Sequence, residues 1–278
     1  MTTGGGQVYV SFSGGKDSTV LLDIARQVYP DIEAVFVDTG LEYPEIREFV
    51  KTKENVTWLK PKKNFRQIIQ QKGYPVISKV VSHAAGIAKR NPNGAVMKNQ
   101  FDPNNKGQFG VYKWKHLIDA PFDVSDKCCD IMKKAPVHIY THKSGKKQIL
   151  GTMACESVIR RNQWLKTGCN AFENNFPPST PLAFWTEQDI LKYLKEYNVP
   201  YCSVYGEIKQ DDKGKYYTTG EKRTGCMFCM FGVHLEKEPN RFQRMKETHP
   251  QIYDYCMRPT SEGGLGMDEV LTYLGIKH

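Results

Sequence analysis

The first sixty residues alternate between short apolar runs and longer stretches with helical periodicity. Residues 7–12 (QVYVSF), 32–40 (IEAVFVDTG) and 55–60 (NVTWLK) are rich in β-branched and aromatic residues, which is typical of buried strands. Between them, residues 17–29 carry apolar side chains at helical spacing, and residues 43–50 have a proline near their start, as helices often do. Strands that alternate with helices predict an α/β fold with a doubly wound, mostly parallel sheet.

The rest of the chain is less regular. Residues 146–161 predict another strand that runs into a polar turn and a helix, and residues 186–197 predict a helix that begins at a capping threonine. Residues 91–111 are crowded with Asn, Gly and Pro and have no period, so we expect an exposed loop or a lid over the ligand crevice. The run at 136–143 (PVHIYTHK) is rich in residues that favour strands.

The length of the chain and its turn-rich stretch suggest two parts. The chain has 278 residues, more than the commonest single domain, and we find no internal repeat. Residues 206–225 are rich in turn-forming residues and precede a cysteine pair and short helical segments. We therefore expect a main α/β domain over residues 1–205 and a smaller, cysteine-bearing C-terminal region over residues 206–278.

Composition limits the compartment and the kind of partner. No apolar run of 18 residues is present, and the first ten residues lack the pattern of a secretory signal, so we expect a cytoplasmic protein without membrane segments. Lysine and arginine exceed aspartate and glutamate by 9, which favours polyanionic partners, from the phosphates of a nucleotide to a nucleic acid. A merely solvated basic surface explains the same charge equally well.

The segment SFSGGKDS lies where the first strand meets the first helix. Its two glycines allow the backbone amides to converge on an anion, and the following helix adds the positive end of its dipole. Lys16 would neutralise phosphate charge, Ser13 and Ser18 would donate hydrogen bonds, and Asp17 would orient Mg2+ or a water near the phosphates. The spacing differs from the Walker pattern, but it predicts a phosphate-binding loop better than it predicts an ordinary turn.

These motifs resemble a known family. SFSGGKDS resembles the PP-loop of the ATP pyrophosphatase superfamily, whose members typically cleave ATP between the α and β phosphates, and FVDTGLEYPE resembles the next strand and turn of its phosphoadenosine phosphosulfate (PAPS) reductase branch. GTMACESVIRR is similar to the family's Gly-x-Arg-x-x-Glu-Ser segment, with Met153 where arginine is usual. Residues 181–201 are similar to its late Trp-Thr-Glu-x-Asp helix, and in all the resemblance covers about residues 7–230.

The resemblance implies a fold and a set of site residues. It implies the adenine nucleotide alpha hydrolase-like arrangement of the sheet, with a PP-loop nucleotide-binding domain over residues 1–205. The implied nucleotide-binding residues are Ser11, Ser13, Gly14, Gly15, Lys16, Asp17, Ser18, Asp38, Thr39, Gly40, Gly151, Glu156 and Arg160. Lys16, Asp17 and Ser18 would be catalytic. Arg160 or Arg161 would supply the anion contact that Met153 lacks, although both arginines also suit surface ion pairs.

Four of the eight cysteines form two close pairs. Cys128 and Cys129 are adjacent, and Cys226 and Cys229 follow after 96 intervening residues. By number, four thiolates suit zinc or iron and sulfide equally. An adjacent pair joined with a distant Cys-x-x-Cys resembles the four-iron cluster signature of adenylyl-sulfate reductases and of DNA phosphorothioation ATP pyrophosphatases. The resemblance therefore implies a [4Fe-4S] cluster, with zinc and four free thiols as alternatives.

The remaining cysteines and the histidines give weaker signals. Cys155 lies in the segment that resembles substrate-binding residues, which makes it a minor candidate to carry sulfur; Cys169, Cys202 and Cys256 have no partner spacing. His138 and His142 are four residues apart, but no third ligand is near them in the sequence.

Cations and tryptophans accompany these motifs. Lys127, Lys133, Lys134 and Arg223 are close to the paired cysteines in the sequence, where cations would lower the pKa of a thiol. The tryptophans that could stack on nucleic-acid bases are better explained by core packing; they are Trp114, Trp164 and Trp185.

The function we expect is an ATP pyrophosphatase that binds Mg2+ and ATP, adenylates an acceptor and releases pyrophosphate for sulfur insertion. The resemblance favours a nucleic-acid acceptor, either DNA (phosphorothioation) or tRNA (thiolation), and a cysteine desulfurase as the partner that supplies sulfur. A sulfonucleotide (APS or PAPS) reductase is the alternative, but its cysteine on a C-terminal tail has no counterpart after Cys256, where the chain reads EVLTYLGIKH. A non-catalytic nucleotide-binding module and a homo-oligomer stay open.

Overall fold

The computed structural model describes residues 8–107, 109–170 and 178–278, which form two compact units. Unit 1 comprises Met1–Pro61 and Ala135–Gly225, and unit 2 comprises Lys62–Lys134 and Cys226–His278. This division differs from the one expected at residue 205, because residues 62–134 belong with the C-terminal residues and residues 206–225 belong with unit 1. No helix in the described ranges is long and apolar enough to cross a membrane.

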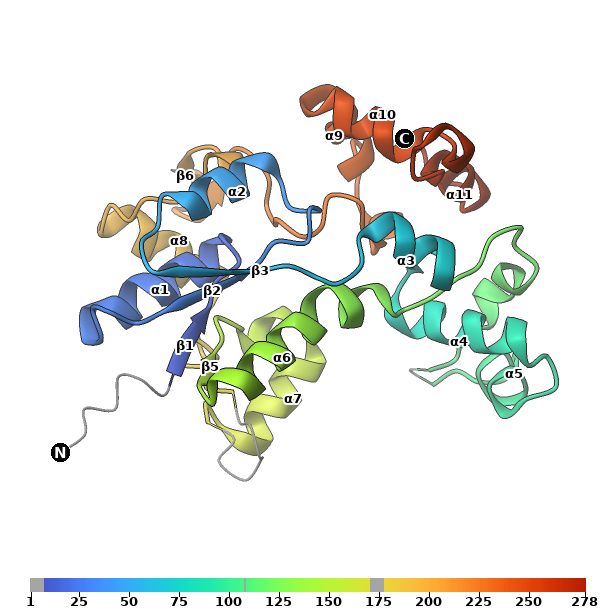
Figure 1. Cartoon of the computed structure of the whole chain (residues 1–278), viewed down its shortest axis with the longest axis horizontal. Helices are drawn as coiled ribbons and strands as arrows, with labels where there is room; N and C mark the ends of the chain where they lie inside the picture. Colours follow the sequence, from blue (N-terminus) through green and yellow to red (C-terminus); the bar gives the residue numbers. More distant parts are fainter. Residues whose placement is uncertain (1–7, 108, 171–177) are drawn as a thin grey trace. The chain divides into compact units, whose positions relative to one another are not determined.

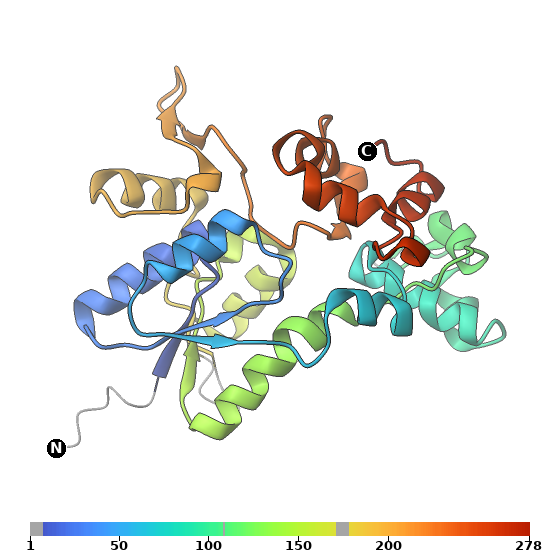
Figure 2. The same cartoon turned by 45° about the horizontal axis from the view of Figure 1, so that its top comes forward.

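Unit 1 is built on a parallel sheet, as the sequence predicted (Figures 1 and 2). Its four strands are β1 (Val8–Ser11), β2 (Ala34–Val37), β3 (Val56–Leu59) and β5 (Lys147–Ile149). Their order is β3-β2-β1-β5, and every neighbouring pair is parallel. In the register, Val10 of β1 lies opposite Ala34 on one side and Ile149 on the other. The strand order therefore reverses at β1, which is where such sheets bind ligands.

Helices cover both faces of this sheet. The helices of unit 1 are α1 (Lys16–Val28), α2 (Pro44–Lys51), α6 (Ala135–Ser144), α7 (Val158–Thr167) and α8 (Glu187–Glu196). Figures 1 and 2 show α1 and α2 on one face and α6 on the other. Short 3-10 turns at Ala154–Glu156 and Ser203–Tyr205 and a hairpin of β6 (Ile208–Gln210) and β7 (Tyr216–Thr218) complete the unit. The doubly wound α/β prediction is confirmed.

Segment 136–143, whose composition favours strands, lies in helix α6. The fully buried Tyr9 of β1 explains the difference, because its hydroxyl is 2.6 Å from Thr141 Oγ1 and its ring meets Tyr140 edge-on at 5.2 Å. Packing of α6 on the sheet outweighs the weak strand preference of these residues. His138 and His142 lie on the exposed part of this helix.

Unit 2 consists of helices and one short parallel strand pair. Its α-helices are α3 (Phe65–Lys72), α4 (Lys79–Arg90), α5 (Ala95–Gln100), α9 (Arg241–Thr248), α10 (Pro250–Met257) and α11 (Met267–Tyr273). Its strands are β4 (Val76–Ile77) and β8 (Met230–Phe231), and its remaining helical turns are Tyr112–Ile118, the π-helical Asp130–Lys134, Val233–Leu235 and Thr260–Glu262. The strand pair joins the two chain segments of the unit.

The segment expected to be an irregular loop, residues 91–111, contains helix α5 and is partly packed. Phe101 and Val111 are buried, and the Val111 amide donates to the Gln100 carbonyl over 2.7 Å. This short helix was not predicted, because the segment is rich in Asn, Gly and Pro and few of the helix's apolar residues are buried. Its role as a lid stays a prediction.

Candidate functional site

The loop between β1 and α1 is held open by its own serines and glycines. Gly14 has φ +71°, and a Cβ there would lie 2.9 Å from Cγ2 of Ile46, so only glycine fits. Ser18 Oγ donates to the Gly15 carbonyl (3.0 Å) and accepts from the Ser13 amide (3.2 Å). Gly15 begins α1 without a side-chain cap. The Lys16 amide donates to the Tyr205 hydroxyl, while the next amides of the first turn have no side-chain cap among the described residues and can meet an anion.

A cavity of about 540 Å³ lies beside this loop, entirely within unit 1. It is lined by Ser13, Gly15, Lys16, Asp17, Met153, Cys155, Glu156, Arg160, Glu187, Tyr205, Lys222, Arg223, Thr224 and Gly225. The first four follow β1 and the next four follow β5, so the cavity is at the carboxyl ends of two neighbouring strands, where the strand order reverses. We call it the loop cavity.

Charged side chains of both signs line the loop cavity. Lys16 is buried, its Nζ donates to Glu187 Oε1 over 3.0 Å, and it lies 5.2 Å from the centre of the Tyr205 ring. Arg160 forms an ion pair with Glu156. Four lysine and arginine side chains line the wall, Lys222 and Arg223 among them, against three aspartate and glutamate side chains. The cavity therefore suits an anionic ligand.

Asp17 is the titrating group of the cavity closest to neutral pH. Burial, followed by the negative charge of Glu156, raises the pKa of Asp17 to about 6, while Lys16 acts in the opposite direction. Glu187 adds to the increase and Arg223 offsets part of it. Asp17 thus carries an unfavourable charge in the cavity at pH 7, which a bound cation would compensate.

The segment after β5 reaches the cavity because Gly151 packs against the start of α1. A Cβ on Gly151 would lie 3.1 Å from the Asp17 carbonyl oxygen, a distance that larger residues rarely tolerate. The turn that follows is closed by Glu156, whose carboxylate accepts from the Met153 amide over 3.0 Å. Met153 is buried in the cavity wall, and Arg160 supplies the arginine there. Arg161 lines a smaller adjoining cavity of about 270 Å³.

The end of β2 is close in the fold but does not line the loop cavity. Asp38 is buried and pairs with Arg47 over 2.9 Å, and its other oxygen accepts from the Gly40 amide. Thr39 Oγ1 donates to Glu42 over 2.7 Å. Ser11, Gly14 and Ser18 are likewise absent from the cavity wall, where Ser18 instead braces the loop. Contacts of these residues with a nucleotide stay a prediction.

Several wall residues were not expected from the sequence. Tyr205 accepts the Lys16 amide hydrogen over 3.3 Å, and its hydroxyl lies 2.5 Å from Thr224 Oγ1. Glu187 and Lys222 also had no assigned role. Arg223, expected near the cysteines, instead lines the loop cavity. The run Lys222-Arg223 in a turn-rich stretch was the one available signal.

All eight cysteines lie in the described part of the chain, and each is a free thiol. Cys128, Cys129, Cys226 and Cys229 all belong to unit 2. Burial raises the pKa of Cys128, and so do the charges of the other three, which places the four thiols within electrostatic reach of one another. Within the described ranges, no group of three or more His, Cys, Asp or Glu is arranged to hold a metal ion. The cluster and zinc both stay predictions.

Basic residues surround these four thiols. The Arg241 guanidinium donates to the Cys229 carbonyl over 2.8 Å and pairs with Glu236. Burial raises the pKa of Cys229, and the charges of Arg241 and Lys133 oppose this increase. The π-helical turn that directly follows Cys129 carries Lys133, and such turns occur often at functional sites. These cations offset part of the increase that burial causes in the pKa of the thiols.

Comparison with curated proteins finds weak but extended similarity. The chain is 24% identical over 270 residues to an uncharacterised protein of Methanocaldococcus jannaschii, covering 95% of this chain and 50% of that protein. It is 26% identical over 202 residues to the adenosine 5'-phosphosulfate reductase of Geobacillus kaustophilus, covering 71% and 66%. The chain thus spans about half the length of the first of these relatives and just under two thirds of the second.

A solved structure and a family model add to this comparison. The phosphate complex of phosphoadenylyl-sulfate (PAPS) reductase from Candida auris is 16% identical, covers 75% of this chain and 83% of its own, and has a TM-score of 0.41. The family model described as the phosphoadenosine phosphosulfate reductase domain matches residues 7–89 and 56–230, which include every wall residue of the loop cavity. The chain therefore belongs to the phosphoadenosine phosphosulfate reductase domain family.

Proposed function

We propose that unit 1 is an ATP pyrophosphatase that transfers the adenylyl group of ATP to an acceptor. The observation that carries this proposal is the loop cavity, which combines the start of α1, whose N-cap Gly15 offers no side-chain cap, with Lys16 and Arg160. A triphosphate needs many donors and cations in one place, and backbone amides at a helix start supply the donors. The volume of about 540 Å³ suits a nucleotide-sized ligand.

The chemistry would be an in-line displacement at the α-phosphate. An acceptor oxygen forms a bond to the α-phosphorus, the bond from this phosphorus to the bridging oxygen breaks, and pyrophosphate leaves with the electron pair. The loop amides and Lys16 would stabilise the charge that develops on the leaving group. Mg2+, when bound, would neutralise the phosphates, and the ionised Asp17 would orient it or one of its waters.

The acceptor and the sulfur donor belong to the same proposal. A nucleic-acid phosphate or base is the acceptor that the excess of 9 positive charges favours, and a cysteine desulfurase would supply the sulfur as a persulfide. The outer persulfide sulfur would attack the adenylated centre and displace AMP, and a thiol reductant would then cleave the S–S bond and leave the sulfur on the acceptor. The charge and the shape of the surface around the loop cavity, described below, support a nucleic-acid acceptor.

A sulfonucleotide reductase is the second candidate, favoured by one specific observation. A relative named adenosine 5'-phosphosulfate reductase aligns over 71% of this chain, and the exposed Cys155 lines the loop cavity. A thiol at that position could meet the sulfur of a bound sulfonucleotide. The two candidates share the nucleotide site and differ in the bond that breaks.

We also propose that Cys128, Cys129, Cys226 and Cys229 bind a [4Fe-4S] cluster, with zinc as the alternative. This proposal is supported by the four thiols, which come from two distant segments, lie together in unit 2 and influence one another's pKa. Four thiolates complete the coordination of either group.

Product analysis with the purified full chain tests the proposal. Labelled ATP is incubated with Mg2+, a desulfurase, cysteine and nucleic acid, and pyrophosphate is measured. We expect release that Lys16→Ala abolishes and that Lys195→Ala, an exposed lysine of α8 outside the cavity, preserves. Sulfite release from APS or PAPS with a thiol would establish the reductase instead. Nucleotide binding without formation of either product would indicate a non-catalytic nucleotide-binding module.

A further inference from the structure

Two smaller cavities of unit 1 continue from the loop cavity along the surface. The first, of about 270 Å³, shares Cys155 with the loop cavity and is also lined by Arg161 and Trp164. The second, of about 290 Å³, shares Phe184 and Trp185 with the first and extends along α8. Because they share wall residues, the three cavities are neighbours in one series, which begins at the phosphate-binding loop.

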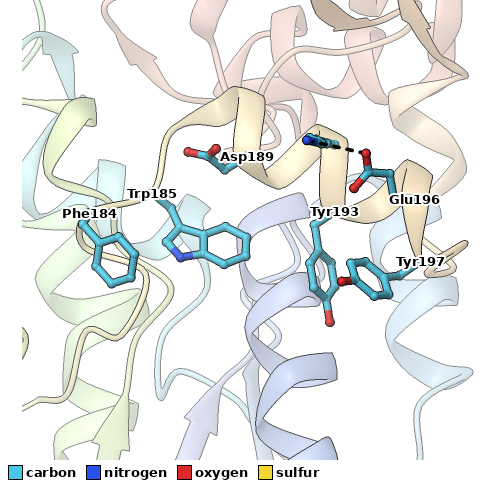
Figure 3. A pocket seen from close by; sticks show the side chains of 7 residues that line it. Phe184, Trp185, Asp189, Tyr193, Glu196 and Tyr197 are labelled. Atoms are coloured by element: carbon cyan, nitrogen blue, oxygen red, sulfur yellow. Dashed lines mark ion pairs between the residues drawn. The ribbon is translucent and has the colours of Figure 1, made fainter.

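Aromatic rings line this series where it runs along the surface. Figure 3 shows Phe184 and Trp185 before the start of α8, Tyr193 within this helix and Tyr197 directly after its last residue. The ring centres of Trp185 and Tyr193 are 5.9 Å apart, and those of Tyr193 and Tyr197 are 4.5 Å apart. We call Trp164, Phe184, Trp185, Tyr193 and Tyr197 the aromatic track.

The aromatic track is exposed, which core packing does not explain. Phe184 is 64% exposed and Tyr197 is 66% exposed, while Trp164 and Trp185 are half-buried. An apolar surface of this kind, with cations beside it, marks a place where a ligand binds.

The charges along the series favour an anionic ligand. Its four glutamate and aspartate side chains other than Asp17 all have partners within the chain: Glu156 with Arg160, Glu187 with Lys16, Asp189 with Thr186, and Glu196 with Lys192. By contrast, Arg161, Lys222 and Arg223 form no ion pair or side-chain hydrogen bond with any residue that the structure describes. Three cations therefore remain available to an incoming polyanion.

We propose that the aromatic track binds single-stranded nucleic acid, whose unpaired bases stack on its rings while its phosphates meet Arg161, Lys222 and Arg223. Aromatic platforms beside cations bind unpaired strands because every base has a face that can stack. A duplex hides those faces, so the track selects unpaired nucleotides without selecting a sequence. As the substrate of the proposed adenylyl transfer, on which this inference rests, the strand would bring one acceptor group past Cys155 to the edge of the loop cavity.

Binding of labelled strands to the full chain tests the inference without ATP. Fluorescence anisotropy is recorded with a labelled oligothymidylate and with a duplex of the same length. We expect the unpaired strand to bind more tightly, and Phe184→Ala/Tyr197→Ala to weaken it by roughly tenfold or more, since each lost stack contributes about 1–3 kcal/mol. Tyr217→Ala, which removes another exposed ring of unit 1 outside the cavities, is the matched control and should bind as the wild type does.

The charge contribution has its own readout. Arg161→Gln should weaken binding of the strand and lower the slope of log K against log salt by about 1, because one phosphate contact is lost. Equal affinity of the wild type and the double aromatic variant, or preference for duplex, would overturn the inference. Tighter binding of a lysine-rich peptide than of the strand would also overturn the inference, because the rings of the track would then bind cations.

Photo-crosslinking locates the bound strand independently of affinity. An oligonucleotide containing 5-iodouracil, irradiated with the protein, should label peptides that contain Trp164, Trp185, Tyr193 or Tyr197. Labels confined to other aromatic residues would contradict the proposal. Because no nucleotide turnover is measured in either experiment, an inactive pyrophosphatase that still binds strands on the track would refute the proposed function alone.

Discussion

The amine of Lys16 lies 3.0 Å from Oε1 of Glu187, although 171 residues separate the two in the sequence. Lys16 is buried, and the Glu187 side chain is 55% exposed. The best-placed cation of the loop cavity is therefore already engaged by a carboxylate that faces solvent. A phosphate that enters the cavity has to compete with this carboxylate for Lys16.

The first prediction follows from that competition. Glu187→Gln should tighten ATP binding by about two- to tenfold, because it removes one negative charge near the phosphates in a partly solvated site. Isothermal titration with ATP measures the change. Glu207→Gln, which removes an exposed carboxylate outside the cavity, is the control. Weaker binding by Glu187→Gln would mean instead that Glu187 is needed to position Lys16.

The second prediction concerns pH and Asp17. The pKa of Asp17 is about 6 in the folded protein and 3.8 as a free side chain, so the folded state binds this proton more tightly. Ionisation of Asp17 therefore destabilises the fold as pH rises from about 4 to about 6, and the full cost is present at pH 7. Asp17→Asn should raise the free energy of unfolding at pH 7.5 by about 1–3 kcal/mol, with little gain near pH 4.

Denaturant unfolding in EDTA without nucleotide measures this difference at both pH values. The exposed Asp212, in the turn of the β6–β7 hairpin, gives the control substitution Asp212→Asn, which should change stability little at either pH. A gain for Asp17→Asn that is equal at pH 4 and pH 7.5 would refute the electrostatic explanation.

The third prediction separates backbone strain from steric overlap in the loop between β1 and α1. Gly14 and Gly145 have nearly the same φ, +71° and +69°, but only Gly14 has atoms that a Cβ would meet. Gly145→Ala should cost about 1–2 kcal/mol of unfolding free energy from its left-handed backbone alone. Gly14→Ala should cost about 1–3 kcal/mol more because its Cβ overlaps with Ile46 and Val50. Equal costs would show that α2 moves away freely.

The fourth prediction uses Cys155 as a reporter of the loop cavity. Because this exposed thiol lines the cavity, bound ATP should slow its alkylation by iodoacetamide several-fold. Cys169 is partly exposed, lies in the same unit and lines none of the cavities described above, so its alkylation should keep its rate. Mass spectrometry of the modified peptides gives both rates. Unchanged alkylation of Cys155 at saturating ATP would place the nucleotide elsewhere.

The fifth prediction concerns the four thiols of unit 2. Protein purified without oxygen should contain iron and sulfide, and Cys229→Ser should lower the metal content per folded chain. Cys256→Ala is the control, since Cys256 is a fully buried thiol of the same unit outside the set of four. Stoichiometric zinc without iron would select the alternative metal, and metal content unaffected by Cys229→Ser would remove Cys229 from the ligands.

The parts of the site that could be predicted from sequence are those built by neighbouring residues. The loop around Gly14 and Lys16 has a local signature, because a strand, two glycines and a helix start must follow in that order. Gly151 and Glu156 were likewise found through one short segment. Each of these lies where the pattern placed it, next to the carboxyl end of a strand.

The parts that could not be predicted depend on distant residues meeting in space. Tyr205 meets the amide of Lys16 from 189 residues away, and no local pattern of the segment around Tyr205 indicates this contact. Helix α6 was hidden for a similar reason, since its strand-like composition is outweighed by packing against Tyr9. Each unit also combines stretches that are separate in the sequence, whereas turn-forming residues indicate only where one stretch ends.

The position of β1 between β2 and β5 has a consequence for how the chain can vary. β1 precedes residues 62–134 in the sequence and β5 follows them, so the two strand ends that supply the loop cavity come from before and after a 73-residue excursion. Lengthening such an excursion costs little closing entropy, since each doubling adds only about 0.6 kcal/mol. Evolution can therefore rebuild the excursion extensively while the loop cavity keeps its form, but a break in the chain after β3 would separate the loop that follows β1 from the wall residues that follow β5.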